Sequence, residues 1–376
     1  MKILHIIIGL NVGGAEMMLK RLVESHHGNR AYRHIVVSLT DMGKLGEQIQ
    51  SKGVEVYSLG MRSVFGTPLV LWRLVHLIRK SRPDIVQTWM YHADLLGGLA
   101  ARLAGNRHVI WGIRTTEVQA GGSRVTVVVR HICALLSRWV PHTIVCAANA
   151  ACRVHVAVGY DATRMVVIPN GFDFTRLLVM DGERAALWAQ CKFNADDMVI
   201  GSLGRFNPVK DQQNFVRAAG LIAQRNPHVR FLMVGRDLDA NNAELVRWIA
   251  DTGYANRFVL LGERADVPIC LAAMDVYCLH SRTEGFPNTV GEAMAMGVPC
   301  VVTDVGDAAI LVADTGIVVP KDDSVALAQG LEQILAMTSE ARKQMGQRAK
   351  ARVNAEFTIE RARKRFEAIY EKVLNG

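Results

Sequence analysis

The sequence lacks the features that mark secreted, membrane-spanning and zinc-binding proteins. Its seven cysteines are an odd number and include no Cys-x-x-Cys pair, which argues against a disulfide framework or a zinc site. No apolar run is long enough to span a bilayer, and residues 1–9 are too short for the apolar core of a signal peptide and contain no cleavage site. We therefore expect a cytoplasmic protein in which residues 2–8 form a buried strand.

The chain has 376 residues, half of them hydrophobic, which is enough for two cores rather than one. Its charge is segregated along the sequence. Residues 1–170 contain 20 Lys/Arg and 9 Asp/Glu, a net charge of +11, whereas residues 171–376 contain 24 and 26, a net charge of −2. Such segregation predicts a binding partner for the first half.

Strand-like and helix-like segments alternate from end to end, a pattern typical of parallel sheets with crossover helices. A turn-rich segment at residues 168–173 divides them into two series. The strands predicted in the first series are 2–8, 34–39, 54–57, 85–89, 109–113 and 143–146, and those in the second are 199–203, 229–234, 257–261, 275–279, 298–302 and 316–319. The clearest predicted helices are 14–25, 68–81, 93–104 and 124–139.

Residues 281–299, SRTEGFPNTVGEAMAMGVP, are the most informative stretch. They lie between two predicted strands, and Pro287 with Asn288 favours a helix start. That helix start offers free backbone N–H groups to an anion, and the carboxylates of Glu284 and Glu292 on either side can accept hydrogen bonds from hydroxyl groups. The arrangement suggests a phosphate flanked by polyols, as in a nucleotide sugar. For either glutamate alone, a structural role beside the helix dipole is the alternative.

Glu284 and Glu292 are separated by seven residues, and the first is followed directly by Gly285, Phe286, Pro287 and Asn288. This pattern resembles the motif of the family 4 (group 1) retaining glycosyltransferases, which have the GT-B fold, and the resemblance extends over residues 275–306. It implies an α/β protein of two doubly wound, Rossmann-like parallel-sheet domains facing across a cleft.

The resemblance also implies how the domains divide the work. We expect an acceptor-binding domain at residues 1–170, a donor-binding domain at 171–357, and a terminal helix at 358–376 that crosses back to the first domain. Glu284 would orient the hydroxyl groups of the donor sugar, and Glu292 those of the ribose.

Further residues match loops of this family. Arg205 and Lys210 match its Gly-Arg…Lys loop, whose cations neutralise the leaving diphosphate, although two cations on a turn are often only solvated. Glu263 and Arg264 lie where relatives hold the nucleotide base, mostly through backbone groups, and an exposed surface loop is the alternative.

The acceptor side is predicted less directly. Gly13 and Gly14 match the family's paired glycines near the donor diphosphate and the acceptor. His92 ends a strand and begins a helix, where it would contact acceptor or donor, or cap its helix. Many relatives have a functional histidine near Arg114, and this sequence has none, so Arg114 is the remaining candidate there.

Alternative functions depend on other motifs. Asp237-Leu238-Asp239 is the manganese motif of a different glycosyltransferase fold, but Arg205 and Lys210 already supply counter-charge, so we expect no metal and no cofactor. Residues 9–14 do not have the Gly-x-Gly-x-x-Gly spacing of a dinucleotide-dependent oxidoreductase, in which Asp41 would bind the ribose. A nucleotide-sugar epimerase or phosphorylase of the same fold stays open.

The sequence thus predicts a retaining, metal-independent hexosyltransferase. It would move a sugar from a nucleoside-diphosphate sugar, with UDP as the favoured nucleotide, to a glycan or lipid-linked acceptor in cell-surface polysaccharide or lipopolysaccharide synthesis. We expect no nucleic-acid partner.

Two amphipathic segments of the basic first half suggest where the protein acts. Residues 69–80 place Arg73, His76 and Lys80 along one stripe, and residues 124–139 combine an apolar face with Arg130, His131, Arg138 and Trp139. They predict docking on an anionic membrane, at the inner face of the cytoplasmic membrane. Packing of both helices into the core of their own domain is the alternative.

Overall fold

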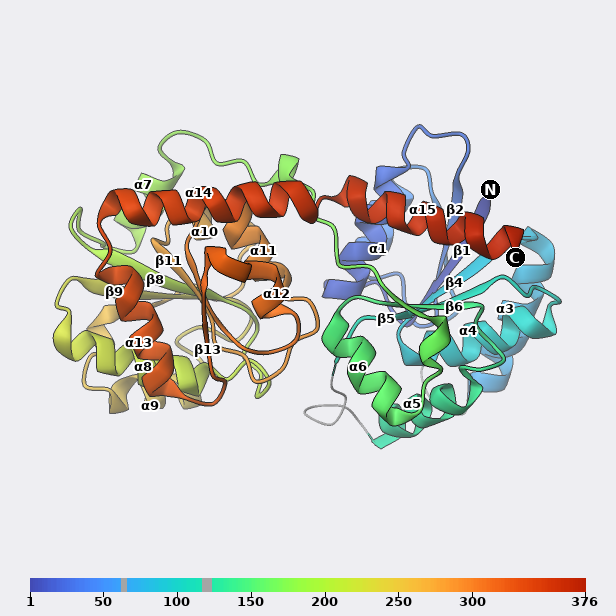
Figure 1. The fold of residues 1–376 in the computed structure, drawn as a ribbon, viewed down its shortest axis with the longest axis horizontal. Coiled ribbons are helices and arrows are strands. Elements are labelled where there is room, and N and C mark those ends of the chain that lie inside the picture. The colour runs from blue at the N-terminus through green and yellow to red at the C-terminus, as the bar shows by residue number, and fades with distance from the viewer. Residues whose placement is uncertain (62–65, 117–123) are drawn as a thin grey trace. The chain divides into compact units, whose positions relative to one another are not determined.

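The computed structural model describes residues 1–61, 66–116 and 124–376. The chain forms two compact units, and each is described by itself (Figure 1). The first unit comprises Met1–Gly171 and Ile359–Gly376, and the second comprises Phe172–Thr358. The chain therefore passes between the units twice. Beside these passages, Phe172 pairs with Thr358 in an isolated parallel bridge, and its N–H donates to the carbonyl of Phe357 at 2.8 Å.

The first unit is a parallel sheet of seven strands in the order β3-β2-β1-β4-β5-β6-β7. The strands are β1 (Lys2–Ile7), β2 (Arg33–Ser38), β3 (Glu55–Ser58), β4 (Ile85–Trp89), β5 (Val109–Ile113), β6 (Thr143–Cys146) and β7 (Met165–Val167). The helices are α1 (Gly14–Ser25), α2 (Gly43–Gln50), α3 (Thr67–Ser81), α4 (Tyr91–Leu103), α5 (Arg124–Leu136), α6 (Asn149–Val158) and α15 (Ile359–Asn375).

Helices cover both faces of this sheet. In Figure 1, α1 and α15 lie on one face, and α3, α4 and α5 lie on the other. The central strands β1 and β4 are mostly apolar and almost entirely buried, as expected for a parallel sheet with two covered faces. The core on the side of α1 includes Phe366, Tyr370 and Val373 of α15, so the last helix is part of the first unit's hydrophobic core.

The second unit is a parallel sheet of six strands in the order β10-β9-β8-β11-β12-β13. The strands are β8 (Met198–Leu203), β9 (Val229–Val234), β10 (Phe258–Leu260), β11 (Val276–Leu279), β12 (Cys300–Thr303) and β13 (Ile317–Val319). The helices are α7 (Glu183–Gln190), α8 (Gln212–Arg225), α9 (Ala243–Asp251), α10 (Val267–Ala272), α11 (Asn288–Ala295), α12 (Ala308–Val312), α13 (Ser324–Leu335) and α14 (Ser339–Glu356).

Side-chain caps fix several helix starts in the second unit. The carboxylate of Asp211 accepts from the N–H of Asn214 at the start of α8, and that of Asp323 accepts from two N–H groups at the start of α13. The helices α8, α9 and α13 pack together on one face of the sheet, with α7, α10, α11, α12 and α14 on the other (Figure 1).

The predicted fold class is confirmed, since both units are doubly wound parallel sheets. Among the described residues, no helix combines the length and the apolar character needed to cross a membrane. All seven cysteines are free thiols, and six of them are buried.

Candidate active site

The strand order of the second sheet reverses between β8 and β11. Ligands of open parallel sheets bind at such a reversal, at the carboxyl ends of the strands. The segments that follow β8 and β11 contain Arg205, Lys210 and Glu284, and because the two strands are direct neighbours these residues lie at one edge of the sheet. A backbone hydrogen bond from the N–H of Arg282 to the carbonyl of Val209, at 2.9 Å, ties the two segments together.

An ion pair lies at the centre of this edge. The Nζ of Lys210 is 2.6 Å from Oε1 of Glu284, and the hydroxyl of Ser281 donates to the same oxygen at 2.7 Å. Both charged side chains are mostly buried, with 26% of Lys210 and 12% of Glu284 exposed. Burial strengthens such a pair and restricts its geometry. A cation suited to phosphate therefore lies directly beside a carboxylate suited to sugar hydroxyl groups.

A second group of ion pairs, centred on Arg282, also connects these loops. The Nε of Arg282 is 3.1 Å from a carboxylate oxygen of Asp211 and 2.7 Å from one of Asp322. Asp211 is buried, and its burial raises the pKa of its carboxyl group, an effect that the charge of Arg282 opposes. Its backbone has a φ of 54°, a left-handed conformation that is uncommon for a non-glycine residue.

The turn after β12 supports the backbone around Glu284. Gly306 has a φ of 59°, and a Cβ atom at this position would lie 2.4 Å from the carbonyl oxygen of Gly285 and 2.6 Å from that of Glu284. The N–H of Asp307 donates to the carbonyl of Gly285 at 2.9 Å. Only glycine fits this close backbone contact without displacing the loop.

The predicted helix start is present as α11, with Pro287 before its first residue and no side-chain cap. Its first backbone N–H groups lie at the same edge as Glu284, and Asn288 is the first helical residue. Glu292 is the fifth residue of α11, so it lies just beyond the first turn. The side chain of Phe286 is buried against Phe172 and Phe357, which leaves its backbone rather than its ring to face a ligand.

The remaining predicted donor residues lie farther along this edge. Arg205 is exposed in the loop after β8. Glu263 and Arg264 follow the edge strand β10, two strands away from β8. Glu263 is exposed and lies 3.6 Å from Arg236. Arg264 makes two hydrogen bonds to Asp266, which raise the pKa of Arg264 and lower that of Asp266.

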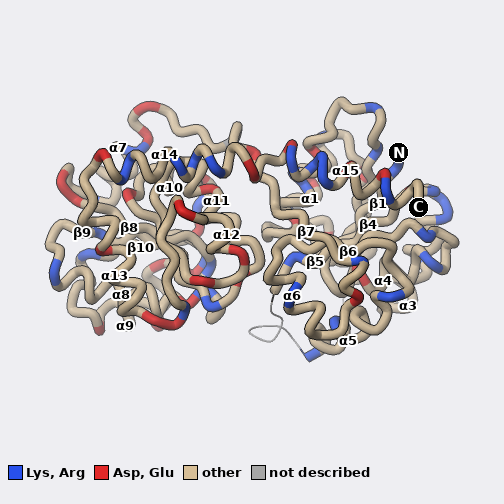
Figure 2. Tube along the Cα trace, viewed as in Figure 1, with Lys and Arg blue, Asp and Glu red and all other residues tan. Residues whose placement is uncertain are grey.

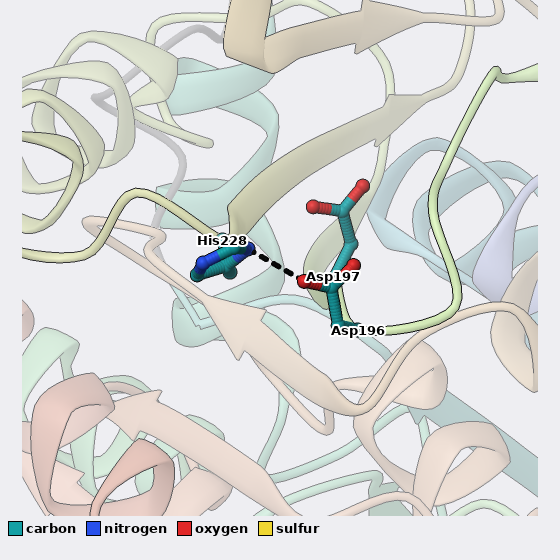
Figure 3. A group of neighbouring side chains, drawn as sticks. All are labelled: Asp196, Asp197 and His228. Atoms are coloured by element: carbon teal, nitrogen blue, oxygen red, sulfur yellow. Dashed lines mark ion pairs between the residues drawn. The ribbon is translucent and has the colours of Figure 1, made fainter.

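Acidic residues with metal-binding potential occur at a different place. Among the described residues, the only group of three or more suitable side chains is Asp196, Asp197 and His228, at the amino ends of β8 and β9 (Figure 3). His228 forms an ion pair with Asp196 at 2.9 Å, while Asp197 pairs with Arg230 at 2.9 Å. In Figure 3 the dashed line marks the pair of His228 with Asp196, and a carboxylate oxygen of Asp197 lies within 4.8 Å of both partners. These contacts indicate a structural ion-pair cluster at the edge opposite the donor loops.

Asp237 and Asp239, the literal Asp-x-Asp motif, follow β9 on the donor edge. A carboxylate oxygen of Asp239 accepts from the N–H of Asn241 at 2.8 Å, and the carbonyl of Asp237 accepts from the side chain of Asn242. These contacts close the turn that leads into α9.

The first sheet has the corresponding reversal between β1 and β4. The segment after β1 contains Gly13, which precedes α1, and Gly14, the first residue of that helix. The segment after β4 contains His92, the second residue of α4, which is half-buried and whose pKa is lowered by burial. The structure therefore places the paired glycines and His92 at neighbouring strand ends within this unit.

Arg114 directly follows β5 at the same edge of the first sheet. Its guanidinium stacks on Trp89, at 4.6 Å from the ring centre, and donates to the side-chain oxygen of Asn170 at 3.1 Å. Burial lowers the pKa of Arg114 to about 10. Its Nε and one Nη are buried without a hydrogen-bond partner in the described structure. Such a cation, stacked but incompletely paired, suits an anionic or hydroxyl-rich ligand.

Several residues that build these sites carry no obvious sequence signal. Ser281 and Gly306 lie within the stretch that resembles the family, but only their contacts with the Glu284 loop reveal what they do. Asn170 is distant from Arg114 in sequence and reaches it through the fold. His280 directly follows an apolar strand, and the sequence gives no sign of its contacts with Lys210 and Ser202.

Models of known protein families match both parts of the chain. Residues 12–176 match the model of "Glycosyltransferase Family 4", and residues 197–337 match the model of "Glycosyl transferases group 1". Together the two models cover most of both units.

Individual relatives of the chain are also named as glycosyltransferases. The UDP-Gal:alpha-D-GlcNAc-diphosphoundecaprenol alpha-1,3-galactosyltransferase of Escherichia coli is 29% identical over 62% of this chain and 60% of its own length. The lipopolysaccharide core mannosyltransferase LpsB of Rhizobium meliloti is 30% identical over 46% of this chain and 52% of its own. The chain thus spans less than two thirds of either relative. In fold, it is similar to Anabaena HepE, solved in complex with UDP, with a TM-score of 0.86, 23% identity, and coverage of 99% of this chain and 100% of that one.

Proposed function

Because this chain belongs to the family 4 (group 1) glycosyltransferases with the GT-B fold, we propose that it transfers a hexose from a nucleoside-diphosphate sugar, with UDP as the nucleotide, to a glycan or lipid-linked acceptor. The product would contribute to cell-surface polysaccharide or lipopolysaccharide. The activities of the galactosyltransferase and of LpsB support this substrate class, and the UDP complex of HepE supports the nucleotide.

The pairing of Lys210 with Glu284 is the observation that carries the proposal. It puts a phosphate-binding cation and a hydroxyl-binding carboxylate within 2.6 Å of each other at the strand reversal. A sugar esterified to a diphosphate has phosphate oxygens and hydroxyl groups close to each other, and these are the groups that the two side chains would bind. Arg205 and the backbone N–H groups at the start of α11 add positive charge for the phosphates.

The proposed reaction retains the configuration at the anomeric carbon. The bond from that carbon to the leaving phosphate oxygen breaks, and the acceptor hydroxyl attacks from the same face through an oxocarbenium-like state. The leaving phosphate accepts the proton of that hydroxyl. Lys210, Arg205 and the start of α11 stabilise the charge that develops on the diphosphate, so the mechanism requires no metal ion.

We assign the remaining donor and acceptor contacts from the positions of the residues at the two sheet edges. Glu292, beyond the first turn of α11, would accept hydrogen bonds from the ribose hydroxyl groups, and the backbone of Gly285 and Phe286 would complete the phosphate site. Glu263 and Arg264 would border the base. In the first unit, Gly13, Gly14, His92 and Arg114 would bind the acceptor.

Turnover assays test this function. Calorimetry with UDP-, GDP- and ADP-sugars would identify the donor, and we expect the UDP-sugars to bind most tightly. NMR of the product would give the anomeric configuration, where an inverted product would contradict a retaining mechanism. Activity that disappears with EDTA and returns with manganese would contradict metal independence and make Asp237 and Asp239 the candidate ligands.

We further propose that the first unit docks on an anionic membrane. Exposed apolar side chains gather on three neighbouring helices: Leu69 and Trp72 on α3, Leu103 at the end of α4, Val125, Val128, Ile132 and Leu135 on α5, and Trp139 just after α5. Leu135 is 71% exposed and Trp139 is 66% exposed. The spacing on α5 makes one continuous apolar row, as in helices that lie in a membrane interface.

The charge around this row fits an anionic surface. Residues 124–139 contain no Asp or Glu, and the exposed basic side chains on α3 and around α5 are Arg73, Arg79, Lys80, Arg124 and Arg138. Figure 2 marks the Lys and Arg residues of this unit. Arg130, expected at this surface from the sequence, is only 5% exposed and instead lies in the interior. Each basic group near an anionic bilayer contributes about 1 kcal/mol of binding.

Vesicle sedimentation tests the membrane proposal and the associated location at the inner face of the cytoplasmic membrane. We expect pelleting with anionic vesicles that weakens as salt rises, and a strong loss of pelleting in Leu135→Glu. Val325→Glu is the matched control, since Val325 is an exposed apolar residue of the second unit. Equal pelleting on neutral and anionic vesicles, or none at low salt, would contradict this proposal.

A further inference from the structure

His280 directly follows β11, immediately before the Ser281–Glu284 segment, and is 4% exposed. Its ring stacks on Phe215 with the ring centres 5.0 Å apart. The two ring nitrogens contact different parts of the β8 side of the site. The Nδ1 lies 2.5 Å from the carbonyl oxygen of Lys210, and the Nε2 lies 2.7 Å from the hydroxyl of Ser202 on β8.

These partners determine which nitrogen carries the proton. A backbone carbonyl only accepts hydrogen bonds, so Nδ1 must carry a hydrogen and donate to Lys210. In the neutral ring Nε2 is then an acceptor, and the hydroxyl of Ser202 donates to it. Burial lowers the pKa of His280 to about 4, so the neutral ring persists at physiological pH.

The main chain of Lys210 is therefore fixed at both polar atoms. Its N–H donates to the carbonyl of Asn207 at 2.9 Å, and its carbonyl accepts from His280. The next residue, Asp211, has the left-handed φ of 54°. A non-glycine residue keeps such a conformation where surrounding contacts hold it, often at a functional site. The His280 hydrogen bond is one of these contacts, and it joins the strand that leads to Glu284 to the loop that contains Lys210.

We propose that His280 is a positioning residue that fixes the backbone of Lys210 and so directs the Lys210 ammonium group toward the donor diphosphate beside Glu284. This inference rests on the proposed function, in which Lys210 binds the diphosphate. His280 itself touches neither donor nor acceptor.

Two substitutions separate the two hydrogen bonds. The side-chain nitrogen of asparagine lies as many bonds from Cβ as Nδ1 of histidine does, so His280→Asn keeps the donor to Lys210. The side-chain amide of glutamine corresponds to Nε2, so His280→Gln keeps only a partner for Ser202. Ser202→Ala is the matched control, because it removes the Ser202 hydrogen bond and leaves the Lys210 one.

The readout is the ratio of UDP affinity to UMP affinity, measured by calorimetry. Lys210 contributes to this ratio through the additional phosphate, and Lys210→Ala should lower it by about tenfold or more, the loss typical of a charged hydrogen bond. We expect His280→Gln to lower the ratio by about fivefold with UMP affinity unchanged, and His280→Asn and Ser202→Ala to keep the ratio within about twofold of wild type.

The outcomes distinguish a failure of the proposed function from a failure of the role of His280. A wild-type protein that binds UDP no more tightly than UMP would contradict the proposed function. If Lys210→Ala lowers the ratio but His280→Gln does not, or if His280→Asn lowers it as much as His280→Gln, the positioning role of His280 alone is overturned. Should His280→Gln fail to fold, His280→Phe keeps the stacked ring, removes both hydrogen bonds and must show the same loss of the ratio.

Discussion

The carboxyl ends of the two sheets share a topology and differ in chemistry. Each has a strand reversal with a loop on either side, between β1 and β4 in the first unit and between β8 and β11 in the second. The second edge is held by the Lys210–Glu284 and Arg282–Asp211 ion pairs. The first edge has a glycine loop, a half-buried His92 and a stacked arginine, Arg114. Under the proposed function, the second edge would bind the charged leaving group, while the first would bind the acceptor.

Removing the cations of the second edge should have the largest effect. We expect Arg205→Ala with Lys210→Ala to reduce kcat/KM at least about a thousandfold, since two groups that stabilise charge in the transition state are lost. Steady-state kinetics with the identified UDP-sugar measures this. Arg247→Ala with Arg217→Ala, two exposed cations on α9 and α8 of the second unit, is the control. A loss below tenfold would contradict the role assigned to the pair.

Acidification should separate the stabilities of the two units. Four buried histidines of the first unit, His5, His26, His34 and His155, have pKa values lowered by burial, to about 3 for His34 and about 4 for His155. Below about pH 6.5 the unfolded chain binds protons that the folded unit does not, so stability falls as pH falls. Asp94 opposes this, because burial raises its pKa to about 7.

The second unit has one such histidine, His280, and two carboxyl groups, Asp211 and Asp275, whose pKa values are raised by burial. We therefore expect hydrogen exchange at pH 5, compared with pH 7, to show a loss of protection in the first unit on the order of a few kcal/mol, and a smaller loss in the second. Equal losses in both units would contradict this comparison. Asp94→Asn should steepen the loss in the first unit, since it removes the opposing group.

Glu292→Ala tests whether the second edge binds ribose. We expect nucleotide binding to weaken by about 1–3 kcal/mol, because the ribose hydroxyl groups lose their acceptor. Calorimetry with UDP measures it. Glu340→Ala removes an acid from the first turn of α14 and is the control for a simple dipole effect. Unchanged affinity in Glu292→Ala would leave that glutamate with a structural role only.

Gly306→Ala tests whether the Glu284 loop depends on its close backbone contact with Gly306. Gly306→Ala should destabilise the second unit by about 1–2 kcal/mol and weaken donor binding, through both the positive φ and the clash with Gly285. Gly253→Ala is the matched control, since Gly253 has a φ of 76° and open space around the position of Cβ. Equal effects of the two substitutions on donor binding would show that the clash is irrelevant.

Arg114→Gln should have the smallest effect and the most selective one. We expect the acceptor KM to rise about fivefold while donor affinity stays unchanged, because the residue belongs to the edge of the first sheet. Arg184→Gln, which removes a guanidinium stacked on Trp188 in the second unit, is the control. A change in UDP affinity in Arg114→Gln would contradict the division between the two edges.

Most of the fold was predictable from the sequence because its strands are apolar and separated by crossover helices. The predicted strands match β1 to β6 and β8 to β13, with boundaries that differ by at most two residues. The strand β7, Met165–Val167, was not predicted. It has only three residues, all partly exposed, at the edge of the sheet, and so lacks the long apolar run that marks the others.

The candidate site was predictable only where charge and spacing are local in sequence. Arg205, Lys210 and Glu284 were named as separate groups, and the 2.6 Å ion pair between the last two required the structure, because 74 residues separate them. The environment of Arg114 depends on Trp89, Asn170 and Phe366, three residues from distant segments. Nothing in a single sequence indicates that these meet.

The two passages of the chain between the units have a consequence for the order of folding. The segment up to Gly171 leaves the ribosome before the second unit does, yet the core of the first unit is incomplete without Phe366, Tyr370 and Val373, which are made after the second unit. The second unit, in contrast, is a continuous segment and can close as soon as Thr358 has emerged. During synthesis the first unit therefore begins to emerge before the second but is completed after it, and an apolar face of its sheet stays uncovered until α15 is made.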